Sequence, residues 1–118
     1  MAIVVYNGAV TAGGTDGSAV TADNPILISA ERGTVSKTVQ LALRATGPQH
    51  YLCGLQATGK DAEQVQVSLD GVAWSKRVFL EQVDTRNRLL FLRTVVGAEE
   101  DYGVNNAVAL QLDYYQPV

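Results

Sequence analysis

The most reactive side chains in this sequence are its single histidine and its single cysteine. His50 and Cys53 lie close enough together to suggest a cysteine nucleophile served by a histidine base. Their separation is an odd number of residues, so on a strand the two side chains would point to opposite faces. We therefore interpret His50 as an imidazole at the edge of a loop and Cys53 as a small buried thiol. Neither is expected to be catalytic.

A second candidate for chemistry is the acidic run Glu99, Glu100 and Asp101. General acid–base catalysis needs two carboxylates held in a rigid pocket, whereas consecutive carboxylates on a loop are typical of a solvated surface. Asn105 and Asn106 follow, but the spacing of these oxygen donors does not match the twelve-residue calcium loop. We expect no metal site, no cofactor and no enzymatic activity.

The segment from Ser68 to Trp74 (Ser-Leu-Asp-Gly-Val-Ala-Trp) is the most specific local motif. Asp70 and Gly71 can adopt the positive φ of a tight turn, and Ser68 can hydrogen-bond the turn backbone. Trp74 then returns as a large apolar anchor, or as a ring that stacks on a sugar. Together with Tyr51 and Tyr102 it makes carbohydrate binding an alternative function.

That motif resembles the Asp-box of sialidases and related propellers. It departs from the box because no residue separates Asp70 from Gly71, and because it occurs only once in the sequence. The same sequence pattern recurs in fibronectin-like and discoidin-like sandwiches, so the resemblance implies a folding signature and not a function.

The elements that must position these residues have the pattern of β-strands. Hydrophobic residues make up 47% of the 118 residues, and Val, Ile and Thr together make up about a quarter, a bias that favours strands. The clearest alternation runs from Ser36 to Ala45. Short strands with turns every 8 to 12 residues predict an all-β fold: one single-domain antiparallel β-sandwich over residues 1–118, immunoglobulin- or fibronectin-like, with about seven to nine strands.

Residues 7–24 form a Gly/Thr/Asp-rich segment that we expect to be a loop or an arm. Its Gly13 to Gly17 stretch lacks the Lys-Ser/Thr and the helix start of a phosphate-binding loop. Pro25 follows, and a proline is tolerated at the first residue of a strand because it donates no ladder hydrogen bond there. Ile26 to Ile28 would be that strand.

Five residues are expected to form an interface. The strand from Leu89 to Val96 is apolar on both faces, so it is either central in a two-layer fold or covered by a partner at Leu89 and Phe91. The two terminal strands carry aromatic residues that could pair across subunits by strand addition. The predicted interface residues are Tyr6, Leu89, Phe91, Tyr114 and Tyr115.

Charge and hydropathy limit the remaining function classes. Nine Lys and Arg against twelve Asp and Glu give a net charge of −3, and the basic residues are mostly scattered, so nucleic acid is not an expected partner. No run approaches the roughly 18 apolar residues of a membrane span, and the opening apolar run Ala2 to Tyr6 is too short for a signal peptide.

Three stretches together resemble a family. The opening Asp-Gly-Ser-Ala-Val-Thr-Ala-Asp-Asn-Pro-Ile (residues 16–26), the alternating Val39 to Arg44 and the final Val108 to Tyr115 are similar to small prophage-encoded proteins of phage structural gene clusters. The resemblance implies an immunoglobulin-like sandwich in a tail or decoration role. It predicts a non-enzymatic structural protein in the virion, or in the host cytoplasm during assembly, that associates with itself and with other virion proteins.

Overall fold

A computed structural model describes residues 3–47, 51–59, 61–100 and 102–115 of the chain. Over these residues the secondary structure consists of strands and one 3₁₀ turn, η1 (Ala62–Gln64). None of the described residues forms a helix long and apolar enough to cross a bilayer. The strands are β1 (Ile3–Asn7), β2 (Ser18–Ala19), β3 (Ile26–Ala30), β4 (Val39–Ala45), β5 (Tyr51–Thr58), β6 (Val65–Ser68), β7 (Arg77–Val83), β8 (Arg88–Thr94) and β9 (Val104–Tyr115).

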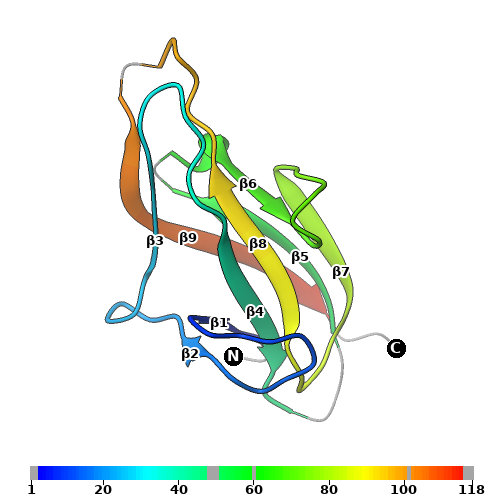
Figure 1. The fold of residues 1–118 in the computed structure, drawn as a ribbon. Coiled ribbons are helices and arrows are strands. Elements are labelled where there is room, and N and C mark those ends of the chain that lie inside the picture. The colour runs from blue at the N-terminus through cyan, green and yellow to red at the C-terminus, as the bar shows by residue number, and fades with distance from the viewer. Residues whose placement is uncertain (1–2, 48–50, 60, 101, 116–118) are drawn as a thin grey trace.

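The strands form two antiparallel sheets that pack face to face (Figure 1). The first sheet has the order β2-β1-β4-β8-β6, and the second has the order β3-β9-β5-β7. The prediction of an all-β antiparallel sandwich is confirmed. Its strands are the short runs of alternating residues that the sequence pattern predicts. Each sheet directs one row of side chains into the core between the sheets.

The strand order relates this sandwich to the immunoglobulin fold. In the first sheet, β1-β4-β8-β6 follows the order of immunoglobulin strands A, B, E and D, and β9 lies beside β5 as strand F lies beside strand C. The outer strands of the second sheet enter from other points of the chain. Strand β3 comes directly before β4, and β7 lies between β6 and β8.

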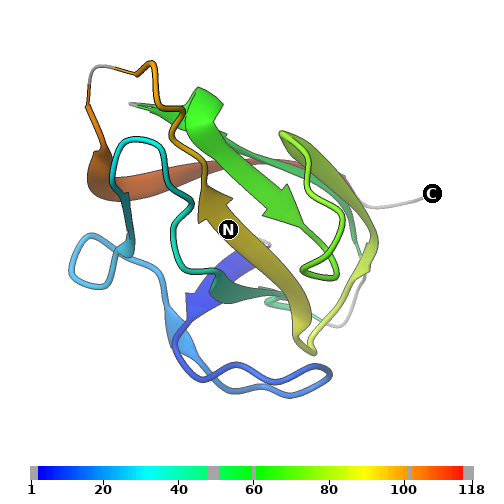
Figure 2. The same ribbon diagram turned by 45° about the horizontal axis from the view of Figure 1, so that its top comes forward.

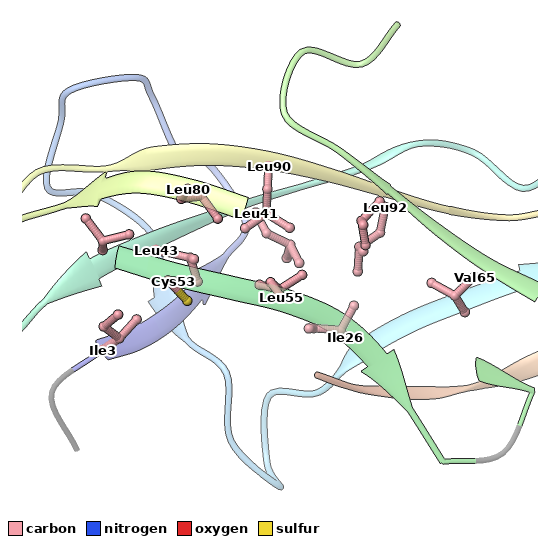
Figure 3. Close-up of a cluster of buried hydrophobic side chains, with 12 residues drawn as sticks. Ile3, Ile26, Leu41, Leu43, Cys53, Leu55, Val65, Leu80, Leu90 and Leu92 are labelled. Carbon is pink, nitrogen blue, oxygen red and sulfur yellow. The ribbon is translucent and has the colours of Figure 1, made fainter. Parts of the chain in front are cut away.

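The core lies between the sheets and draws on both (Figure 3). In β4 the inward row contains Leu41 and Leu43, and in β8 it contains Leu90 and Leu92; all four are fully buried. Pairing of Leu41 with Leu90 brings these rows into register. The buried cluster is Ile3, Ile26, Leu41, Leu43, Cys53, Leu55, Val65, Val67, Leu80, Val83, Leu90 and Leu92.

Cys53 is part of this core, as the sequence predicts, and its side chain is 0% exposed. Burial, aided by the negative charge of Asp113 and opposed by Arg77, raises the pKa of the thiol from 9.0 to about 11. A thiolate is therefore disfavoured at neutral pH, and the group is a poor nucleophile in the folded protein.

We expect the raised pKa of Cys53 to lower the free energy of unfolding at alkaline pH. The folded thiol holds its proton more tightly than the unfolded thiol, so the stabilisation is complete below pH 9 and is lost as pH rises from 9 to 11. Wild type should lose about 2 kcal/mol more over that range than Cys53→Ala, which has no thiol to titrate. Urea unfolding of both proteins at several pH values measures the difference. Parallel pH profiles would contradict the expectation.

Candidate functional site

A groove of about 1210 Å³ lies beside β3. One wall is β3 itself, and the other is the returning chain of residues 34–40, which leads into β4 (Figures 1 and 2). Gly8, where the chain leaves β1, and Gly103, just before β9, lie at its ends. The lining residues are Gly8, Leu27, Ile28, Ser29, Ala30, Glu31, Thr34, Val35, Ser36, Lys37, Thr38, Val39, Gln40 and Gly103.

Both walls of the groove are sheet edges. Strand β3 pairs with β9 on one side, and none of the described strands pairs with its other side. In the first sheet, β1 pairs with Ala42–Ala45 only, so the described chain leaves Val39–Leu41 unpaired on the side that faces the groove. Backbone N–H and C=O groups at such an edge are a template for another strand.

The other three terminal strands of the two sheets, β2, β6 and β7, have protected edges. Strand β2 is only two residues long. Val67 of β6 exchanges backbone hydrogen bonds of 2.8 and 3.0 Å with Ser75, so the chain covers that edge itself. Strand β7 carries the exposed charges of Arg77 and Glu81. Short length, self-pairing and charge are the devices by which natural proteins prevent edge pairing.

Strand β3 has none of these protections. Its sequence is Ile-Leu-Ile-Ser-Ala, five residues without a charge or a proline. Ile26 and Ile28 point into the core, while Leu27 is 67% exposed. Across the groove Val35 is 51% exposed. The open edge is therefore apolar as well as unpaired, a combination that marks a binding surface.

The predicted interface residues lie elsewhere, in both sheets: Tyr6, Leu89 and Phe91 share the outer face of the first sheet, while Tyr114 and Tyr115 belong to the second. Tyr6 is on the outer face of the first sheet, where the guanidinium carbon of Arg44 lies 3.6 Å from its ring centroid. Tyr115 is exposed on the outer face of the second sheet. Tyr114 is half-buried against the core and meets Tyr51 edge to face at 5.7 Å.

Leu89 and Phe91 are half-buried because two loops of the same chain rise beside them. Residues 12–13 stand on one side and residues 69–70 on the other, leaving a depression of about 600 Å³. A Cβ at Gly71 would lie 3.8 Å from the Phe91 ring. The second apolar face of this strand is thus partly covered from within the chain, and a partner contact at the remaining depression stays a prediction.

Residues 8–17 form a loop, the 8–17 loop. A polar network centred on Asn87 holds it beside Leu89 and Phe91. The Nδ2 of this 3% exposed residue donates to Asp16 Oδ1 (2.7 Å) and to the Thr11 carbonyl (2.9 Å). Its Oδ1 accepts from Arg44 Nη1 (2.7 Å). Backbone and hydroxyl donation from Thr11 holds the pKa of Asp16 below its usual value. Within residues 7–24, this stretch is a loop folded onto the first sheet.

The three candidate sugar-stacking rings also stay apart. Trp74 is half-buried, with the guanidinium carbon of Arg93 4.3 Å from its ring centroid. Tyr51 packs against Tyr114, as described above. Tyr102 is 83% exposed in the loop before β9. The described residues therefore place no two of these three rings on one platform.

The Ser68–Trp74 motif forms the predicted tight turn, but of the two residues expected at positive φ only Gly71 adopts it. Ser68 Oγ accepts from the backbone N–H groups of Asp70 (3.2 Å) and Gly71 (2.8 Å), and Gly71 has a φ of 79°. Asp70 keeps a negative φ. Its carboxylate accepts from the N–H groups of Ala73 and Val72 and from Ser68, which lowers its pKa.

The candidate catalytic and metal-binding residues form no described site. His50 and Asp101 lie outside the described residues, and Glu99 and Glu100 are exposed on a turn. No group of three or more His, Cys, Asp or Glu residues suited to a metal was found among the described residues.

Sequence reasoning missed Leu27 and Val35, which the structure brings together across the groove. One signal was available. Pro25 at the start of an uncharged run of five residues is typical of an edge strand. Comparisons of this chain with protein-family models, with curated proteins and with solved structures found no match.

Proposed function

We propose that this chain is a non-enzymatic assembly module that joins protein chains by strand addition at β3. The observation that carries the proposal is the unprotected edge of β3, beside a groove of about 1210 Å³. An added strand would satisfy the free backbone groups of β3, and its side chains would pack beside the exposed Leu27 and Val35. Main-chain hydrogen bonds would supply affinity, and the apolar walls would supply selectivity.

The setting that we propose is a virion, in a tail or capsid-associated role. Its support is the resemblance of residues 16–26, 39–44 and 108–115 to prophage-encoded structural proteins. Assembly by a sheet edge suits such a role, because each copy offers the same surface and pairing needs no second component. Carbohydrate binding has weaker support, since its three candidate rings lie apart.

The proposal predicts that a charge at the open edge blocks self-association. Leu27→Lys places an ammonium group on the exposed face of β3, and lysine on an edge strand is a device by which natural sheets prevent edge pairing. We expect sedimentation velocity between about 1 and 100 µM, the usual range of moderate protein affinities, to show concentration-dependent association of wild type. The Leu27→Lys variant should remain monomeric.

Val72→Lys is the matched control, because Val72 is 82% exposed in the turn beside β6 and lies away from the groove. Its association should equal that of wild type. Circular dichroism should show that both variants keep the β fold. A wild-type chain that stays monomeric throughout the range, or equal association of all three proteins, would overturn the proposed function.

A further inference from the structure

The outer face of the second sheet has a glycine at the centre of a row that crosses three strands. Gly54 of β5 lies opposite Phe79 of β7 on one side and opposite Asp113 of β9 on the other. Arg77 lies one row further along, opposite Gln56. A Cβ at Gly54 would clash with the guanidinium group of Arg77. The glycine therefore leaves the room in which Arg77 Nη1 crosses β5 and reaches Asp113 Oδ2 at 3.2 Å.

Arg77 and Asp113 belong to a chain of planar polar groups that hydrogen-bond one another. Gln111 Nε2 donates to the two carboxylate oxygens of Asp113 (3.3 and 3.4 Å), and Gln56 Nε2 donates to Gln111 Oε1 (3.5 Å). The side chains of the ion pair are about half exposed, so solvent screening leaves them little effect on stability. Their mutual contacts instead fix the orientation of donors and acceptors that remain open to a ligand.

Two aromatic rings flank this polar network. Phe79 is exposed on β7, and Tyr115 is exposed two residues beyond Asp113 on β9. Beside them lies a hollow of about 370 Å³, lined by Arg77, Phe79, Leu112, Asp113, Tyr114 and Tyr115. This volume is near the lower end of ligand pockets, roughly 300–1,000 Å³, and suits one or two sugar rings.

We propose that this face binds a neutral oligosaccharide. The C–H groups of a pyranose ring would pack on the electron-rich faces of Phe79 and Tyr115. Its hydroxyl groups, which both donate and accept, would pair with Arg77, Asp113 and Gln111. One guanidinium and one carboxylate cancel, so the network favours an uncharged ligand. The site is separate from the β3 edge, and none of the three rings that the sequence suggests for sugar stacking lines it.

Titration with three neutral hexasaccharides, built of β-linked glucose, N-acetylglucosamine or galactose, tests the proposal on the full chain. At least one of them should shift the backbone amide resonances of residues 77–79 and 111–115, with a Kd of about 0.1–1 mM. Phe79→Ala and Asp113→Ala should each weaken that binding about tenfold. The first removes the stacking surface, and the second removes the acceptor at the centre of the network.

Tyr102→Ala controls for the loss of an exposed ring, because Tyr102 lies in the loop before β9 and does not line the hollow. It should bind the hexasaccharide as wild type does. A hexamer of galacturonic acid controls for ligand charge and should bind no more tightly than the neutral probes. Circular dichroism should show that all three variants keep the β fold.

No amide shift with any neutral hexasaccharide at about 5 mM, several times the expected Kd, would overturn the inference. So would binding that survives both Phe79→Ala and Asp113→Ala, or tighter binding of the acidic hexamer. Self-association of Phe79→Ala should equal that of wild type. Its loss would identify this face as a protein interface and overturn the sugar site, while Leu27→Lys still decides the role of the β3 edge.

Discussion

Asn87→Ala should lower the free energy of unfolding by about 3 kcal/mol. The side chain is 3% exposed and joins the 8–17 loop to the first sheet through Asp16, Thr11 and Arg44. Truncation leaves these donors and acceptors without their partner in a partly buried place, and two of the lost bonds involve ionised groups. Urea unfolding measures the loss, with the m value expected to stay constant.

The backbone of Asn87 gives the experiment a local readout. Its N–H donates to the Gly14 carbonyl (2.8 Å), and its carbonyl accepts from the Gly13 N–H (3.1 Å). When the side chain is removed, the 8–17 loop should open more often, and exchange of the Gly13 amide should accelerate beyond the change in global stability. Thr85→Ala, exposed in the same turn, should change neither quantity. A global loss without faster Gly13 exchange would contradict the anchoring role of Asn87.

The sequence predicts the strands because their signals are local. The alternation of Val39, Leu41 and Leu43 follows from the two-residue period of a strand, and these side chains do face the core side. The Ser68–Asp70 turn is likewise local, because its hydrogen bonds span two or three residues. Both features could be predicted without knowing which strands pair.

The covering of Leu89 and Phe91 could not be predicted in this way. It depends on a contact between Asn87 and Asp16, which lie 71 positions apart. A glycine-rich loop has no periodicity that would place it on a particular sheet, so its sequence fits a free arm equally well. An apolar second face on a strand identifies the need for a cover but does not say whether the same chain supplies it.

The candidate site was hidden for a related reason. Whether a strand lies at the edge of a sheet depends on how all the other strands pair. Strand β3 is an edge strand because β9, which is distant in the sequence, pairs with one of its sides and no described strand pairs with the other. The open edge of β3 is distinctive only because the edges of β2, β6 and β7 are protected. At β6 the protection comes from the chain after the strand, which turns back so that Ser75 pairs with Val67. Pro25 and the uncharged run after it indicate an edge strand, but they do not show that the edge remains open.

Gly17→Ala should lower the free energy of unfolding by about 3 kcal/mol, because two separate costs add at this position. The residue has a φ of 104°, which L-residues rarely adopt. A Cβ would also clash with Cγ1 of Val10 and lie 3.1 Å from Cβ of Tyr6. Val10 is buried, so its methyl group cannot simply swing into solvent. Urea unfolding of the variant measures the combined cost.

Substitutions at two other glycines separate the cost of backbone strain from the cost of the steric clash. Gly13 has a φ of 70° but open space where its Cβ would be, so Gly13→Ala should show backbone strain alone, about 1 kcal/mol. Gly47 has open space and no positive φ, so Gly47→Ala should have little effect. The order Gly17, Gly13, Gly47 is expected only if the 8–17 loop is packed against the sheet. Equal losses of stability at Gly17 and Gly13 would mean that Val10 does not contact a Cβ at position 17. The 8–17 loop would then not be packed on the sheet in the way that shields part of Leu89 from solvent.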